Sequence, residues 1–120
     1  MTTPGISQDP MYQMLRNDDV AGFNKAIDQG MPCNLRGSDL RGLDLRGIHV
    51  AGMDLTDAYF RGTDLRGVDF RGCSLDGVSL ANAKVSGCYF PPELDANELR
   101  LSLEFGTRLR HKKAPQQPEM

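Results

Sequence analysis

The sequence predicts a solenoid, in which the chain bends at a fixed period and stacks its coils around one apolar axis. Twelve consecutive five-residue units run from Cys33 to Pro92 without an insertion. The third residue of every unit is apolar, and the fifth is glycine in nine of them. Because repeats at a short fixed period stack matching positions against one another, the apolar residues are expected to face inward.

A period of five residues suits neither a straight helix nor a straight strand. On a helix, five steps turn the chain by about 140° beyond a full turn, so the apolar residues would spiral over every face. On a strand, an odd step alternates between faces. One shared face therefore requires a bend in every unit. Asp57 and Asn82, which replace glycine at two corners, tolerate the positive φ of such a bend.

The units resemble the pentapeptide-repeat family, whose consensus is roughly Ala-Asp/Asn-Leu-X-X, as SDLRG, LDLRG and TDLRG show. The resemblance implies an all-β solenoid, a right-handed quadrilateral β-helix with four units per coil and about three coils over residues 33–92. Every fourth unit would then share a wall. The third residues would form four inner ladders: Leu35, Leu55 and Leu75; Leu40, Phe60 and Leu80; Leu45, Leu65 and Val85; and Val50, Phe70 and Phe90.

Short helical caps are expected at both ends, because an open coil exposes apolar core and unpaired backbone. Residues 1–8 are predicted to be disordered, and 9–32 to form the N-terminal cap. Asp9 followed by Pro10 predicts an N-cap and a first helical position. A second helix is expected over 18–29, before a glycine. We expect one face of this helix to cover the first coil, with the residues Val20, Phe23 and Ile27.

The C-terminal cap, residues 93–110, is consistent with a helix or a strand. Asp95 and Glu98 have capping-box spacing, which predicts a helix that ends at Gly106. Residues 99–105 also alternate between apolar and polar, as in a half-buried strand. We favour the helix. Residues 111–120 are predicted to form a disordered tail.

As a helix, the C-terminal cap has two apolar stripes on opposite sides. Leu99 and Leu103 would cover the last coil, and Leu101 and Phe105 would need a partner. We therefore predict a homodimer contact at Leu101 and Phe105. The resemblance supports it, because members of the family often dimerise through C-terminal elements.

Composition argues against several classes of function. The net charge of −2 predicts no general attraction to nucleic acid or to an anionic membrane. No apolar run approaches the roughly 20 residues that span a bilayer, and the first residues lack the features of a signal peptide. Three cysteines do not suggest a disulfide framework. We expect a cytoplasmic protein that binds neither membranes nor nucleic acid directly.

No group of residues predicts catalysis. The two histidines, His49 and His111, have no histidine partner nearby in sequence, and His49 is expected to point outward. The cysteines lack the close spacing of zinc ligands and are expected to be small core residues. They are Cys33, Cys73 and Cys88. We predict no enzymatic activity, no metal and no cofactor.

The arginines are the surface feature that suggests binding. In four of the six units that contain an arginine, an aspartate lies two residues before it, so both are expected on one outer face, where they can neutralise each other. Such a surface is either a solvated surface of mixed charge or a patch that binds an anion or an acidic partner. The candidate protein-binding residues are Arg41, Arg46, Arg61, Arg66 and Arg71.

We therefore expect a non-enzymatic protein-binding or scaffold module, whose partner the sequence does not identify. The resemblance implies an alternative, a DNA-mimicking inhibitor or protector of type II topoisomerases (gyrase) of the quinolone-resistance type. Duplex DNA carries about one charge per 1.7 Å. The repeats, however, hold seven basic residues and seven aspartates, a net charge of zero.

Overall fold

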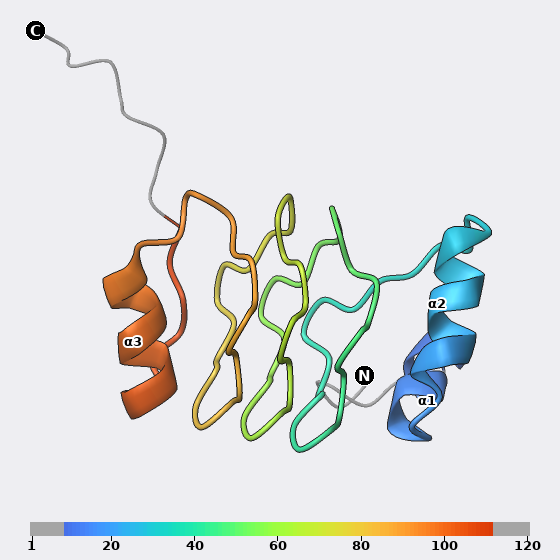
Figure 1. Cartoon of the computed structure of the whole chain (residues 1–120), viewed down its shortest axis with the longest axis horizontal. Helices are drawn as coiled ribbons and strands as arrows, with labels where there is room; N and C mark the ends of the chain where they lie inside the picture. The colour runs from blue at the N-terminus through green and yellow to red at the C-terminus, as the bar shows by residue number, and fades with distance from the viewer. Residues whose placement is uncertain (1–8, 112–120) are drawn as a thin grey trace, which may run out of the picture.

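Three coils are stacked between helical ends in a computed structural model that describes residues 9–111 (Figure 1). Helices α1 (Pro10–Arg16) and α2 (Val20–Asp28) lie at one end, and α3 (Ala96–Phe105) lies at the other. The disorder predicted for residues 1–8 and 112–120 lies outside the described residues. We refer to residues 33–92 as the coil stack.

Parallel bridges join residues that are 20 positions apart, so each coil contains four units. They include Asp39 with Tyr59 and Tyr59 with Ser79. The N–H of Leu40 donates to the carbonyl of Tyr59 at 2.9 Å, and the N–H of Tyr59 donates to the carbonyl of Ser38 at 2.9 Å. Within residues 9–111 the bridges stay isolated and no extended strand forms, because the chain turns in every unit. The expected four-unit coil is present, whereas the expected all-β content is not.

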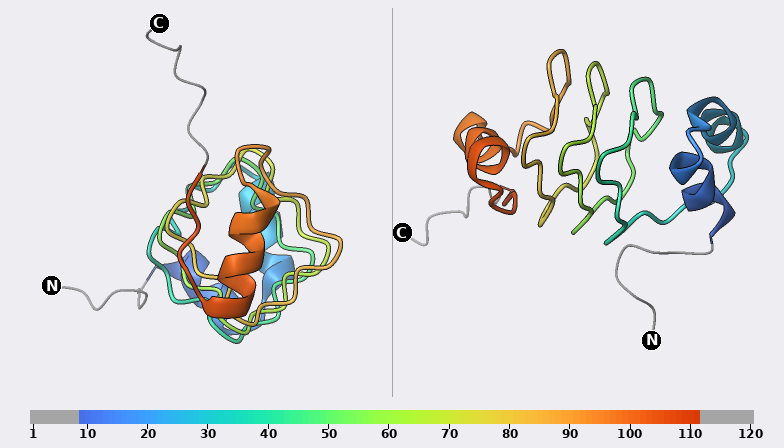
Figure 2. Two further views of the ribbon diagram at one scale, coloured as in Figure 1. Left: turned by 90° about the vertical axis from the view of Figure 1, so that its left-hand side faces the viewer. Right: turned by 90° about the horizontal axis from the view of Figure 1, so that it is seen from below.

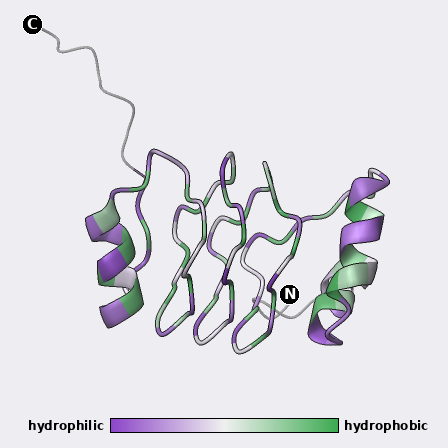
Figure 3. Ribbon diagram, in the orientation of Figure 1, coloured by the Kyte–Doolittle hydropathy of each residue, from purple (hydrophilic) through white to green (hydrophobic). Residues whose placement is uncertain are grey.

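The core lies along the axis of the coil stack, and polar and apolar residues alternate along each coil (Figure 3). Ten of the twelve third-position side chains are buried, each contributing about 1.5–3 kcal/mol. The ring of Phe70 meets that of Phe60 edge-on at 6.2 Å and stacks on that of Phe90 at 5.6 Å. Val85 and Phe90, in the last coil, remain partly exposed.

Each unit ends at a corner with left-handed backbone. The nine corner glycines have positive φ, as do Asp57 at 63° and Asn82 at 58°. This confirms the role predicted for the fifth residue, and it explains why asparagine and aspartate are the residues that replace glycine there.

The N-terminal cap consists of two helices, with boundaries that differ slightly from the prediction. The side chain of Asp9 accepts from the N–H of Met11 at 2.8 Å, as expected of an N-cap. Asp18 has a φ of 62°, so the chain turns there and α2 starts at Val20 instead of residue 18. Phe23 is fully buried, as predicted. The other two residues expected on this face, Val20 and Ile27, pack against the core and are partly buried.

Side chains of the N-terminal cap also bind the backbone edge of the first coil. The hydroxyl of Tyr12 donates to the carbonyl of Asp39 at 2.8 Å. The amide of Asn24 donates to the carbonyl of Gly47 at 2.8 Å and accepts from the N–H of His49 at 2.7 Å. No coil precedes the first one, so these backbone groups find their hydrogen-bond partners in the cap instead.

The C-terminal cap adopts the helix. Asp95 accepts from the N–H of Asn97 at 3.2 Å, but Glu98 does not complete the predicted capping box. Its carboxylate instead binds the guanidinium of Arg110 at 2.7 Å. Arg110 reaches it because the chain reverses after Gly106, which has a φ of 73°.

After that reversal the chain runs antiparallel to the last coil, with a bridge between Ser79 and Arg108. The N–H of Leu109 donates to the carbonyl of Val78 at 2.8 Å. His111, which was expected to begin the disordered tail, accepts from the N–H of Leu75 through Nε2 at 2.9 Å. The assignment of His111 to the tail is therefore wrong, because its side chain caps the last coil.

The C-terminal cap covers only part of the last coil. Helix α3 crosses the end of the stack, and the last coil extends beyond it (Figure 2). Among residues 9–111, the N–H groups of Val85, Gly87 and Phe90 have no hydrogen-bond acceptor. This uncovered edge explains the partial exposure of the Val85 and Phe90 side chains.

Candidate protein-binding surface

One wall of the coil stack is formed by the second unit of each coil, residues 38–42, 58–62 and 78–82; we call it the arginine wall. Arg41 and Arg61 occupy its outer side one coil apart. Two further arginines reach it from the caps. Arg16 comes from the end of α1, and Arg108 lies over the ring of Tyr59 with its Cζ atom 5.5 Å from the ring centre.

Most arginines predicted to form a binding patch are neutralised within their own unit. In each Asp-x-Arg unit the guanidinium Nε and Nη2 atoms donate to both carboxylate oxygens, at 2.9 and 2.7 Å for Arg66 and Asp64. The hydrogen bonds from Arg46 lower the pKa of Asp44 to about 2. The pairs are Asp39 with Arg41, Asp44 with Arg46, Asp64 with Arg66, and Asp69 with Arg71.

Arg61 is the exception among the five predicted arginines. Its unit, AYFRG, has Tyr59 where the other arginines of the prediction have an aspartate. Among residues 9–111, Arg16 and Arg61 are the arginines whose guanidinium groups make neither a hydrogen bond nor an ion pair. Both side chains are exposed. The arginine wall thus presents two guanidinium groups whose donors are unused.

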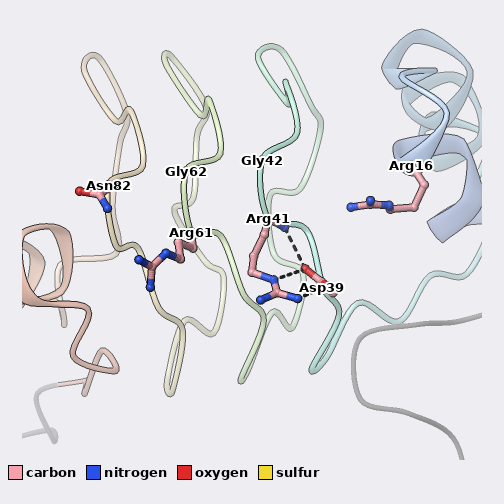
Figure 4. A pocket seen from close by; sticks show the side chains of 7 residues that line it. All are labelled: Arg16, Asp39, Arg41, Gly42, Arg61, Gly62 and Asn82. Atoms are coloured by element: carbon pink, nitrogen blue, oxygen red, sulfur yellow. Dashed lines mark hydrogen bonds and ion pairs between the residues drawn. The ribbon is translucent and has the colours of Figure 1, made fainter.

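A surface hollow of about 490 Å³ lies along this row of arginines (Figure 4). Arg16, Arg41 and Arg61 line it, with Asp39 beside Arg41 and Asn82 beyond Arg61. The hydrogen bond from Arg41 lowers the pKa of Asp39, and the positive charge of Arg16 lowers it further. The carboxylate of Asp39 is therefore ionised and committed to Arg41.

The wall carries more positive than negative charge. Its four guanidinium groups face two carboxylates, those of Asp39 and of Asp57 at the adjoining corner. The ion pair of Arg108 with Asp57 is long, at 3.5 Å. The structure does not bring all five predicted arginines together, because Arg46 and Arg66 lie on the third wall and Arg71 on the fourth.

Sequence reasoning missed the contributions of Arg16 and Arg108. Both belong to the caps, and the repeat period cannot place them over a particular wall. Tyr59 was the available signal, since it takes the place of the aspartate that precedes the other four arginines of the prediction.

The predicted dimer contact lies on the outer side of α3. Phe105 is 72% exposed and Leu101 is partly exposed, whereas Leu99 and Leu103 pack against the core. The two apolar stripes of the helix therefore divide as predicted. The homodimer itself remains a prediction.

Cysteine and histidine side chains in the described part of the chain contact the coil stack or the caps. The cysteines are unpaired; the thiol of Cys73 donates to the carbonyl of Val50 at 3.0 Å, and burial raises the pKa of Cys33 to about 11. His49 lies 3.0 Å from a carboxylate oxygen of Asp28 on α2. Over residues 9–111 no cluster of side chains suits a metal ion.

The helices within residues 9–111 are too short or too polar to span a membrane.

The chain consists of five-residue units, four to a coil, with a helical cap at each end. These features define a repeat protein whose outer walls are available for binding. The chain belongs to the pentapeptide-repeat family. A family model described as pentapeptide repeats matches it in 8 copies, over residues 33–72 and 54–90. Neither a curated protein nor a solved structure matches the chain.

Proposed function

We propose that this chain is a non-enzymatic protein-binding module whose contact surface is the arginine wall. The observation that carries the proposal is the pair of unpaired guanidinium groups of Arg16 and Arg61 beside one hollow. Exposed arginines that lack a carboxylate retain five N–H donors each for a partner. The other walls offer fewer unused N–H donors, because their arginines already bind aspartates.

The experiment compares proteins captured by the wild-type chain and by the Arg16→Glu/Arg61→Glu variant, with cross-linking and mass spectrometry. The matched control is Arg46→Glu/Arg66→Glu, which reverses two charges on the neighbouring wall. We expect a specific partner to be lost with the first variant and kept with the second. A partner kept by both variants, or lost equally from both, would contradict the proposal.

We also propose that the coil stack is a right-handed quadrilateral β-helix, supported by bridges that join residues 20 positions apart. A crystal structure tests the handedness and the presence of strands.

The DNA-mimicking alternative gains no support from the described residues. Mimicry of a duplex requires unpaired negative charge along the walls, and the aspartates of the Asp-x-Arg units are bound to arginines. A gyrase supercoiling assay tests this alternative, and we expect no inhibition by the purified protein.

We further propose a homodimer through Leu101 and Phe105. Its support is the exposed apolar stripe of α3 together with the uncovered edge at Phe90. Sedimentation of the wild type and of Leu101→Glu tests it. A monomeric wild type would exclude the dimer.

A further inference from the structure

We propose that the hollow beside the arginine wall binds an extended acidic segment of a partner protein, with its carboxylates along the axis of the coil stack. The inference rests on the proposed function and adds the chemistry of the partner. It follows from the charge of the wall, from the row in which the arginines lie, and from the contacts that hold this row in place.

The positive charge of the hollow favours an anionic ligand. Arg16 and Arg61 have unused donors, while Arg41 between them is already bound to Asp39 through two bonds of 2.7 Å. A guanidinium fork binds a carboxylate through two parallel hydrogen bonds, so each unused fork can take one acidic side chain. Arg108, with its long ion pair, adds further positive charge along the same wall.

The arrangement of the arginines favours an extended segment over a compact anion. Arg16, Arg41 and Arg61 follow one another along the stack and do not converge on one point (Figure 4). Successive coils are about 4.8 Å apart, and side chains on one face of an extended peptide repeat about every 6.6 Å. An extended peptide with acidic residues at alternate positions can therefore reach separate arginines.

Hydrogen bonds within the chain hold the row of arginines in place. The hydroxyl of Tyr12 on α1 binds the backbone of Asp39 at 2.8 Å, which holds the helix carrying Arg16 against the first coil. Asp39 in turn fixes Arg41, and corner glycines leave the floor of the hollow without side chains. A preformed site lowers the ordering cost of binding.

The experiment measures fluorescence anisotropy of a labelled eight-residue peptide of alternating Glu and Ser, with the Gln–Ser peptide as the uncharged control. From the modest strength of exposed ion pairs we expect about threefold weaker binding for Arg61→Gln and about tenfold for Arg16→Gln/Arg61→Gln. The matched control Arg66→Gln, at the equivalent place on the next wall, should change Kd by less than about twofold. Circular dichroism verifies that every variant is folded.

Three results would overturn the inference. They are equal binding of the Gln–Ser peptide, unchanged binding by Arg16→Gln/Arg61→Gln, and displacement by inorganic phosphate or a single-stranded oligonucleotide at the same charge concentration. Loss of the captured partner in Arg16→Glu/Arg61→Glu without any peptide binding would refute the acidic segment and leave the proposed function standing. Peptide binding that depends on these arginines, without a captured partner, would support the segment and contradict the proposed function.

Discussion

Replacing Gly62 with valine is expected to destabilise the chain far more than replacing it with asparagine. Gly62 has a φ of 67°, and a Cβ atom added there would meet nothing within 4 Å. The penalty therefore comes from the backbone alone. A left-handed conformation costs an ordinary L-residue about 1–2 kcal/mol, and a β-branched residue tolerates it least. Asn82 already occupies the same corner one coil later, with a φ of 58°.

Gly62→Val is thus expected to lose about 2 kcal/mol of unfolding free energy, and Gly62→Asn less than about 1 kcal/mol. At about 4 °C per kcal/mol for a chain of this size, the valine variant should melt about 8 °C lower than the wild type. Thermal and urea unfolding followed by far-UV circular dichroism measure both values. Equal losses for the two variants would refute the left-handed corner as the reason for glycine.

Three further predictions concern the core, the N-terminal cap and pH. Phe70→Ala should cost about 3–5 kcal/mol in urea unfolding, whereas Phe90→Ala should cost less than half as much, because its ring is already partly exposed; equal losses would contradict an uncovered last coil. Asn24→Ala should cost about 1 kcal/mol, since two backbone groups of the first coil lose their partner; an unchanged urea midpoint would argue against this capping. Hydrogen bonds from arginines lower the pKa of Asp44 and Asp69 from 3.8 to about 2, so the stability they contribute is present above pH 4 and declines as the pH falls toward 2; NMR titration of both carboxyls with midpoints near 3.8 would refute it.

The sequence predicted the coil stack because its rule is local. A glycine, asparagine or aspartate corner in every unit and an apolar third residue determine where the chain bends and which side faces inward. The sequence also predicted that α3 has two apolar stripes and that one of them covers the last coil, and Leu99 and Leu103 form that stripe.

The contacts of the caps were not predictable, because they join residues far apart in the chain. Glu98 has the spacing of a capping box but pairs with Arg110, which a chain reversal at Gly106 brings close. His111 binds Leu75 across 36 residues. The binding surface could not be predicted fully for the same reason, since Arg16 reaches the arginine wall only through the packing of α1.

The five-residue period itself tends to produce neutral walls. It places the second and fourth residues of a unit side by side on the outer face, so an Asp-x-Arg unit pairs its own charges. Additional units of this kind would lengthen the stack without creating a binding surface. A charged surface arises where a unit departs from the rule, and Tyr59 is that departure in the unit of Arg61.

Restoring an aspartate two residues before Arg61 should therefore weaken binding of the acidic peptide without removing any arginine. In Tyr59→Asp the new carboxylate lies two residues before Arg61 and can accept hydrogen bonds from its Nε and Nη2 atoms, as Asp64 does from Arg66. We expect the acidic peptide to bind about threefold more weakly or worse, similar to Arg61→Gln. Tyr59→Asn, which also removes the ring and its contact with Arg108 but adds no charge, should stay within about twofold of the wild type. Equal binding by Tyr59→Asp and Tyr59→Asn would show that the unpaired charge of Arg61 does not determine recognition.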